Sequence, residues 1–256
     1  MAAFAVVDEF VVASQRVTSP TELRQCLSDA VTDLGFSFFA VVHHVDLVSP
    51  PPGAVRLSNY PQSFYEAMAR NKYFVDDPVL ATCQRVSRGF LWSEVPTLMP
   101  ITDRQRDIIA LGAREGLGAG YTHPVHMPGE YAGSCSYAVR PGQDVDRQRL
   151  PLLHYLGCFA FEAGRRLARR KATRETPDAF TLTERQLDCL VLVAGGATAR
   201  EAASALGVKQ DTVQKHLEEA KVRAGVRSTT QLVVRSLFDG LLTFQDLLPA
   251  LKRHPS

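Results

Sequence analysis

The chain has 256 residues, of which 45% are hydrophobic and 22% charged, and its formal net charge is +2. This is the composition of a globular protein, and the length allows about two domains. The five cysteines lie far apart and form no C-x-x-C pair, which excludes a cysteine-based zinc or redox motif and favours a reducing cytosol.

Neither a signal peptide nor a membrane span is expected. Residues 1–12 are apolar, but they contain Asp8 and Glu9 and lack a basic start. No uncharged apolar stretch approaches the ~18 residues that a membrane span needs. We therefore expect a cytoplasmic protein without a membrane partner.

Helices and strands are expected to mix over residues 1–169. A helix over residues 21–34 follows Ser19-Pro20, and a buried strand rich in Phe and Val follows over residues 36–45. Further helices are expected over residues 61–73, 78–86, 102–115 and 150–170, and further strands over residues 55–58, 120–125 and 134–139. This pattern predicts an α/β sandwich, an antiparallel sheet flanked by helices, as the N-terminal domain.

A change of composition marks the domain boundary. Residues 170–180 pass from a basic helix end into Thr, Glu and Pro, so we expect a linker there. Residues 181–243 have a helical pattern, which predicts an all-α domain, and residues 244–256 form a C-terminal tail. Three capping boxes mark helix starts in this domain: Thr183-x-x-Gln186, Thr198-x-x-Glu201 and Ser228-x-x-Gln231.

Charge is distributed unevenly along the chain. Residues 1–164 hold 13 Lys and Arg against 17 Asp and Glu, whereas residues 165–256 hold 16 against 10. A basic module after an acidic one predicts that only the C-terminal part binds a polyanion. A basic surface that contacts only solvent would give the same counts.

A helix-turn-helix is predicted between the second and third capping boxes. A helix over residues 201–206, a turn at residues 207–209 and a helix over residues 210–224 have the spacing of this motif. The second helix of such a motif enters the DNA major groove. Gly207 suits the positive φ that a sharp turn requires.

The second helix of the motif divides into a core side and a DNA side. Val208, Val213 and Leu217 are expected to face the core. Lys neutralises phosphates, and Gln and Thr hydrogen-bond base edges. The expected DNA-binding residues are therefore Lys209, Gln210, Thr212, Gln214, Lys215 and Lys221. The alternative is an unrelated helical domain whose Lys and Gln are merely solvated.

Spaced motifs in the C-terminal part carry a family resemblance. They are Leu182-Thr183-x-Arg185, Gly196-x-Thr198-x-x-Glu201-x-Ala203-x-x-Leu206, Thr212-Val213-x-x-His216, Gly225-Val226 and Gly240-Leu241-Leu242. These motifs resemble the C-terminal DNA-binding domain of the LuxR family. Three positions depart from that pattern: Gln186 replaces Glu, Lys209 replaces the Ser that caps the recognition helix, and Glu219 replaces Asn. The lost cap costs ~1 kcal/mol, and Glu219 places a carboxylate on the helix expected to face DNA.

The N-terminal part also carries spaced motifs. They are Tyr60-Pro61-x-x-Phe64-x-x-x-Met68, Asp77-Pro78-Val79, Phe90-x-Trp92 and Gly116-x-x-x-Gly120-x-x-x-Pro124. They resemble the acyl-homoserine-lactone-binding domain of quorum-sensing LuxR-type regulators. The resemblance implies that Tyr60 donates to the ligand's acyl carbonyl, that Asp77 accepts from its amide N–H, and that Trp92 packs beside the headgroup. It also implies that Gly120 leaves space in the pocket wall.

Two further expectations concern the shape and polarity of the pocket. Tyr60, Phe64 and Met68 are spaced i, i+4, i+8, so they share one helix face and could line an apolar pocket. Cys135 or Ser136, on a strand facing the pocket, is expected to add a polar contact.

Two pocket positions depart from the family pattern. Phe64 stands where the family usually has a Trp that donates to the lactone carbonyl, and Met68 stands where it usually has Tyr. A buried carbonyl without its donor costs ~1–3 kcal/mol. The ligand is therefore a lactone bound differently or a molecule with another headgroup, and Tyr60 and Asp77 still favour an amide.

Each of these residues also has a structural alternative. Asp77 before Pro78 is a good helix N-cap with proline at the first helical position. Phe64, Met68 and Trp92 could belong to an ordinary core.

Other classes of function lack their motifs. No nucleophile motif, phosphate loop or pair of catalytic carboxylates is found, so we expect neither an enzyme nor a cofactor. His123 and His126 form an H-x-x-H pair, but on a strand they point to opposite faces, which argues against a metal site. We find no acidic cluster typical of a phosphorylation receiver. A protein-interaction module that docks a partner through the C-terminal helices stays an alternative.

The sequence therefore predicts a ligand-responsive transcription regulator of the quorum-sensing type. We expect it to bind double-stranded DNA as a homodimer, with residues 228–240 at the contact between the DNA-binding domains, and to sense an acyl-homoserine lactone or a related small amide. The alternative is a regulator of the same fold that responds to a different small molecule or to none.

Overall fold

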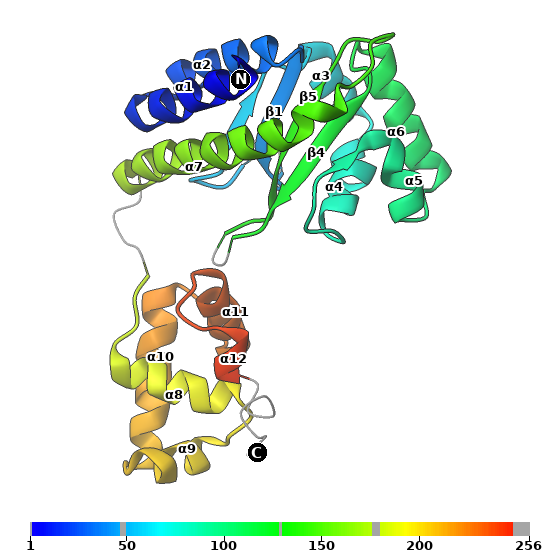
Figure 1. Ribbon diagram of the computed structural model, residues 1–256. Helices are drawn as coiled ribbons and strands as arrows, with labels where there is room; N and C mark the ends of the chain where they lie inside the picture. Colours follow the sequence, from blue (N-terminus) through cyan, green and yellow to red (C-terminus); the bar gives the residue numbers. More distant parts are fainter. Residues whose placement is uncertain (1, 47–49, 128–129, 176–179, 248–256) are drawn as a thin grey trace, which may run out of the picture. The chain divides into compact units, whose positions relative to one another are not determined.

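The computed structural model describes residues 2–46, 50–127, 130–175 and 180–247. They form two compact units. The N-terminal unit holds the sheet and helices α1 to α7, and the C-terminal unit holds helices α8 to α12 (Figure 1). No helix of the described residues is long and apolar enough to cross a membrane.

The N-terminal unit is built on a five-stranded antiparallel sheet of order β2-β1-β5-β4-β3. In β1 and β5, Ala40 pairs with Ser136 and Val42 with Ser134. Side chains alternate between the two faces along a strand, so these four side chains share one face. The strands are β1 (Phe38–His43), β2 (Arg56–Ser58), β3 (Phe90–Leu91), β4 (Gly120–Val125) and β5 (Gly133–Ala138).

Helices α1 (Ala2–Arg16), α2 (Pro20–Asp33) and α7 (Leu150–Glu175) cover one face of this sheet (Figure 1). Helix α2 begins where predicted, because the Ser19 hydroxyl accepts from the Glu22 N–H and Pro20 takes the first helical position. The main apolar core of the unit lies between these helices and the sheet.

The opposite face is covered by short helices, and this is where the pocket described below lies. They are α3 (Gln62–Arg70), η1 (Tyr73–Val75), α4 (Pro78–Cys83), η2 (Trp92–Glu94), α5 (Val95–Leu98) and α6 (Asp103–Arg114), and η3 (Arg147–Arg149) precedes α7. Two smaller apolar clusters fill this side. The predicted α/β sandwich, an antiparallel sheet flanked by helices, is confirmed.

Several elements of this unit were not predicted: helix α1, strand β3 and the short helices η2, α5 and η3. Helix α1 has exposed apolar residues, Phe4 and Val12, on its outer side, and they blur the 3.6-residue periodicity that identifies an amphipathic helix. Strand β3 has only two residues, too few to show any alternation.

The C-terminal unit is entirely helical, as predicted. All three predicted capping boxes form, each with both of its hydrogen bonds, at Thr183, Thr198 and Ser228. The helices are α8 (Glu184–Ala194), α9 (Ala199–Leu206), α10 (Gln210–Ala224), α11 (Thr229–Phe238) and α12 (Phe244–Leu247).

Two expectations about segment ends need adjustment. Helix α7 continues to Glu175, into residues 170–180 where a linker was expected; Pro177 and Asp178 lie outside the described residues. Helix α12 occupies the start of the expected tail, 244–256, of which residues 248–256 likewise lie outside the described part.

Candidate ligand pocket and DNA-binding surface

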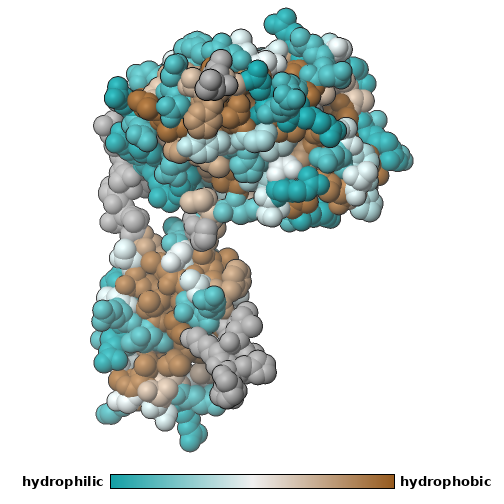
Figure 2. Space-filling view, viewed as in Figure 1, coloured by the Kyte–Doolittle hydropathy of each residue, from teal (hydrophilic) through white to brown (hydrophobic). Residues whose placement is uncertain are grey.

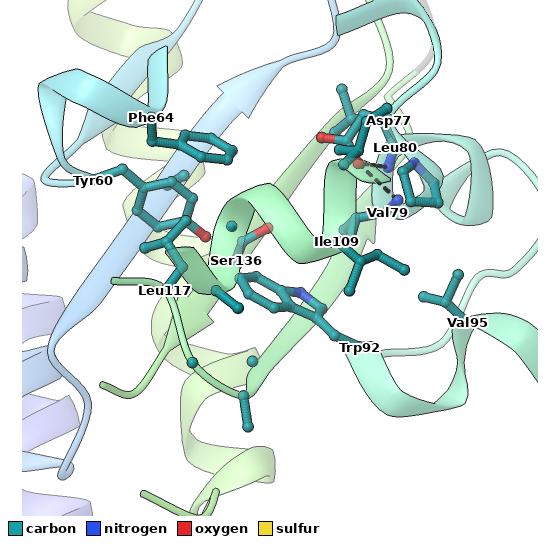
Figure 3. A pocket seen from close by; sticks show the side chains of 18 of the residues that line it. Tyr60, Phe64, Asp77, Val79, Leu80, Trp92, Val95, Ile109, Leu117 and Ser136 are labelled. Atoms are coloured by element: carbon teal, nitrogen blue, oxygen red, sulfur yellow. Dashed lines mark hydrogen bonds between the residues drawn. The ribbon is translucent and has the colours of Figure 1, made fainter. Parts of the chain in front are cut away.

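A cavity of about 680 Å³ lies between the sheet and the short helices of the N-terminal unit (Figure 3). Its wall is largely apolar, with a few polar side chains, which is typical of a small-molecule site. Seven of the eight predicted ligand-binding residues line it: Tyr60, Phe64, Met68, Asp77, Trp92, Gly120 and Ser136.

The Tyr60 hydroxyl points toward Ser136 across one end of the cavity (Figure 3). Its oxygen is buried, and among the described residues it makes no hydrogen bond of normal length and angle, although the Ser136 hydroxyl partly opposes the rise of its pKa. Burial raises the pKa of Tyr60 well above its usual value, so the phenol stays protonated. Tyr60 can therefore donate to a ligand oxygen.

Asp77 caps a helix and lies in the wall of the cavity. Its Oδ1 accepts from the N–H of Val79 at 2.8 Å and of Leu80 at 3.5 Å, which caps helix α4, and its side chain also lines the cavity. Oδ2 takes no part in the cap. Burial raises the pKa of Asp77 to about 6, and the two backbone hydrogen bonds oppose this shift.

Trp92 forms a wall of the cavity and is held from behind. A Cβ atom on Gly120 would lie 2.5 Å from Cε2 of the indole, so only glycine allows the ring to lie against the strand. The Trp92 Nε1–H donates to the Thr122 hydroxyl at 2.9 Å, and that hydroxyl shares a 2.8 Å hydrogen bond with Ser136. The expected space at Gly120 exists, and the indole fills it.

Phe64 and Met68 lie on one face of helix α3, as their spacing predicts, but Tyr60 precedes the N-cap Pro61, so the prediction that it shares this helix face is wrong. Both are buried in an apolar cluster with Ile108, Leu111 and Leu117. They line the cavity and also form core, so neither alternative excludes the other. The Phe64 side chain has no hydrogen-bond donor to offer a ligand.

The prediction that Cys135 faces the pocket is wrong. Its Sγ lies 3.4 Å from the Gly157 carbonyl of helix α7, on the other face of the sheet. Neighbouring residues of a strand point to opposite faces, so Cys135 and Ser136 could not both have faced the cavity. Ser134, two residues before Ser136, lines the cavity and was missed.

His123 and His126 are engaged separately. His123 is buried against α7, where its ring stacks on His154 with 4.3 Å between centroids, and burial lowers its pKa to about 3. His126 Nε2 lies 3.0 Å from the carbonyl oxygen of Cys83. Among the described residues no three His, Cys, Asp or Glu side chains are grouped as metal ligands.

The helix-turn-helix forms as predicted in the C-terminal unit. Helix α9 ends at Gly207, whose φ of 66° makes the turn, and α10 begins after Lys209, which provides no side-chain cap. Val213 and Leu217 are buried, but Val208 is 37% exposed, so its assignment to the core is wrong. The side chain of His216 is partly buried, consistent with a structural role.

Most of the predicted DNA-binding side chains are accessible. Lys209, Gln210, Gln214 and Lys215 are exposed and Thr212 is half-buried. Lys221 was also expected on this exposed face, and that is wrong. Its side chain is only 15% exposed, and its Nζ lies 2.6 Å from Glu218, because residue 221 lies beside the core positions of α10.

Two departures from the LuxR pattern contact each other. The Gln186 side chain is buried; its Oε1 accepts from the Thr183 N–H at 3.2 Å and from Arg223 at 3.0 Å. Its Nε2 lies 3.5 Å from Glu219 Oε2 and donates to it. The Gln186 amide therefore donates and the Glu219 carboxylate accepts, which links helices α8 and α10.

A ligand-sized cavity and a helix-turn-helix in one chain define a sensor joined to a DNA-binding module. Residues 19–164 match the autoinducer binding domain family, and residues 180–236 match the family of bacterial regulatory proteins, luxR family. The chain therefore belongs to the LuxR-type transcription regulators that carry an autoinducer-binding domain.

Relatives are similar along most of their length. The chain is 24% identical over 229 residues, 88% of each chain, to the transcriptional activator protein AhyR of Aeromonas hydrophila. It is 24% identical over 241 residues, 91% of this chain and 93% of the relative, to the quorum sensing-dependent regulator RpaR of Rhodopseudomonas palustris.

Solved structures of Escherichia coli SdiA share the fold. One crystal structure superposes with a TM-score of 0.74 at 19% identity, covering 94% of this chain and 99% of SdiA. SdiA in complex with octanoyl-rac-glycerol superposes with a TM-score of 0.73 at 18% identity, covering 93% and 96%.

Proposed function

We propose that this regulator senses a small acyl amide, of which acyl-homoserine lactones are the first candidates. One observation carries the proposal: a protonated Tyr60 hydroxyl and the Asp77 carboxylate line the same largely apolar cavity. An amide presents a carbonyl that needs a donor and an N–H that needs an acceptor. Tyr60 supplies the donor and Asp77 the acceptor.

The residues expected to contact the ligand's headgroup are the ones in which this chain departs from its family. Phe64 cannot donate a hydrogen bond, and the indole N–H of Trp92 is already used by Thr122. A lactone ring would therefore be held by packing against Phe64 and Trp92. The same wall suits another compact headgroup, so the second candidate is a regulator of this fold tuned to a different amide.

We propose the following division of labour along the chain. Residues 1–169 are the sensor, residues 170–180 with the end of α7 connect it, and residues 181–243 bind double-stranded DNA. The pocket contributes binding groups and no catalytic step. A cytoplasmic location fits these partners.

A homodimer is proposed for the DNA-bound state, with helix α11 at the contact between DNA-binding units. Val222 of α10 and Val234 of α11 are 81% and 61% exposed, and apolar side chains gather on the visible face of this unit in Figure 2. Exposed apolar side chains that gather in this way mark interaction sites.

A panel of acyl-homoserine lactones of different chain length is expected to raise the melting temperature of the sensor unit. A ligand at ~100 times its Kd adds about 2.7 kcal/mol, which corresponds to roughly 5–10 °C for a unit of this size. Thermal melts followed by the fluorescence of Trp92, the single tryptophan, measure this unit. Octanoyl-rac-glycerol, which has no amide N–H, is the control and should stabilise less. A flat response of the folded protein to every lactone would contradict the proposal.

Lys215→Ala is expected to weaken DNA binding without lowering the melting temperature by more than a degree or two. Lys215 is 76% exposed, and the nearest carboxylate, Glu219, is 3.9 Å away. Loss of one phosphate contact should reduce the slope of log affinity against log salt by about 1. Mobility shifts of a duplex selected from random sequence, measured over several salt concentrations, test this.

Lys221→Ala is the matched control, because Lys221 lies on the same helix but is mostly buried and paired with Glu218. Its salt slope should stay close to that of the unchanged protein. Equal slopes for Lys215→Ala and the unchanged protein would rule out this face of α10 as the DNA contact.

A further inference from the structure

The cavity continues past Ser136, away from Tyr60, to the hydroxyl of Ser134, which the proposed amide does not use. Ser134 lies on the cavity face of β5, two residues from Ser136 and opposite Val42. Strand geometry places it about 6–7 Å from Ser136. Helix α4 packs against β4 and β5 here, and Val79 and Leu80 make the surrounding wall apolar.

Ser134 is held by a histidine just beyond the end of the neighbouring strand. His44, which follows β1, places its Nε2 2.9 Å from the Ser134 hydroxyl oxygen. Its Nδ1 is buried and has no hydrogen-bond partner within the described part of the chain. Burial, with smaller effects of His126 and His43, lowers the pKa of His44 to about 4, so the ring is neutral near pH 7.

The unpartnered Nδ1 of His44 indicates which of His44 and Ser134 donates the hydrogen bond between them. A neutral imidazole has one N–H donor and one bare acceptor nitrogen. A buried N–H without a partner is rarer than an under-used acceptor, so the proton belongs on Nε2. The Nε2–H then donates to Ser134, and the Ser134 hydroxyl proton is available to another acceptor.

Among the residues that the structure describes, the group next to that proton is a poor acceptor. The Cys83 thiol lies next to Ser134, and burial raises its pKa to about 12, so it is a neutral thiol. A thiol sulfur is a weak acceptor. An oxygen atom of a bound ligand would be a better one.

We propose that the pocket selects an acyl amide whose chain carries an oxygen atom, and that Ser134, positioned by His44, hydrogen-bonds this oxygen. The inference rests on the proposed function, because the amide held at Tyr60 and Asp77 sets where the chain begins. With C–C bonds of ~1.5 Å at ~111°, an extended chain advances about 1.3 Å per bond. The ~6–7 Å between Ser136 and Ser134 therefore corresponds to about five bonds. Counted from the amide carbonyl as the first carbon, the oxygen is carried by about the sixth carbon of the chain and not by the third.

Three probes test the position of the oxygen. They are N-octanoyl-homoserine lactone, its analogue hydroxylated on the sixth carbon, and its analogue hydroxylated on the third carbon. The intact protein should bind the sixth-carbon analogue roughly three- to tenfold more tightly than the octanoyl parent, the range of one net hydrogen bond. The third-carbon analogue should show no such gain. Isothermal titration gives the three Kd values.

Ser134→Ala should bring the ratio of the sixth-carbon analogue to the parent close to one, while the parent itself binds at least as tightly as before. Ser93→Ala, at a serine that also lines the cavity, should leave the ratio unchanged. Because Ser134 is fully buried, Ser134→Cys is a second variant of similar volume with a weak donor. His44→Gln, whose amide can still donate to Ser134, should keep part of the preference that His44→Leu loses.

Equal affinities for the parent and the sixth-carbon analogue would overturn this inference and leave the proposed function standing. A preference that survives Ser134→Ala would overturn it as well. Absence of binding by all three probes would instead contradict the proposed function, and the inference with it.

Discussion

Asp77→Asn is expected to weaken binding of an acyl-homoserine lactone by about 10- to 100-fold without destabilising the protein. Asparagine is as good an N-cap as aspartate, so the hydrogen bonds to the backbone of Val79 and Leu80 can persist. What is lost is the charged acceptor for the ligand N–H. Hydrogen bonds to charged groups contribute ~1.5–3 kcal/mol, or about 10- to 150-fold in Kd. Titration calorimetry with the lactone that binds best measures this loss.

The pH dependence of binding gives an independent test of the same carboxylate. The pKa of Asp77 is about 6 in the ligand-free protein, and an amide N–H binds the ionised form. Affinity should therefore be highest above pH 6 and fall as the pH drops through 6. Asp77→Asn should lack this dependence.

Stability should respond to the same group in the opposite sense. The pKa of Asp77 is raised from 3.8 to about 6 on folding, so the folded protein binds the proton more tightly than the unfolded chain does. The ligand-free protein then loses stability as the pH rises from about 4 to about 6, and Asp77→Asn removes that loss.

Asp76→Asn is the matched control for the charge. Asp76 is the neighbouring residue, but its carboxylate pairs with Arg104 at 2.6 Å and is outside the cavity lining. Its removal should leave the affinity and its pH profile unchanged. If Asp77→Asn lowered the melting temperature and kept full affinity, Asp77 would be a helix cap and not a ligand contact.

Gly157→Ala is expected to lower the melting temperature of the N-terminal unit by about 3–8 °C. A Cβ at this position of α7 would overlap the His123 Nε2 and lie 2.7 Å from the Tyr137 hydroxyl oxygen. The His123 ring is buried and stacked between His154 and Tyr137, so it has no room to move away. Overpacking of a core costs ~1–3 kcal/mol, or ~2–4 °C per kcal/mol for a unit of this size.

Gly112→Ala is the control, because Gly112 is also a buried glycine within a helix, α6. A Cβ there would meet only the Leu117 Cβ, at 4.0 Å. Without a clash, the better helix propensity of alanine should stabilise the protein by up to ~1 kcal/mol. Trp92 fluorescence melts of the two ligand-free variants should shift in opposite directions. An unchanged or raised melting temperature of Gly157→Ala would show that the space above Gly157 is not tightly packed.

Local sequence signals were sufficient to place helices α8 to α11 of the C-terminal unit and the turn between α9 and α10. Its helix starts are set by hydrogen bonds between residues three positions apart, as at Thr183, Thr198 and Ser228, and its turn by the positive φ of Gly207. Such interactions depend on neighbours along the chain, so they can be recognised without knowing the tertiary structure. The family resemblance added the pocket positions Tyr60, Asp77 and Trp92 in the same way, residue by residue.

Contacts between distant segments were decided only by the tertiary structure. The register of β5 turned Ser134 toward the cavity and Cys135 toward α7. The crossing of α8 and α10 brought Gln186 to Glu219. The burial of one flank of α10 removed Lys221 from the face expected to meet DNA. The sequence by itself determined the family, the two kinds of unit and most residues of the pocket, because those depend on local patterns and on matched motifs. Which side chain faces which partner depends on strand register and helix packing, and these arise from interactions between residues far apart in the chain.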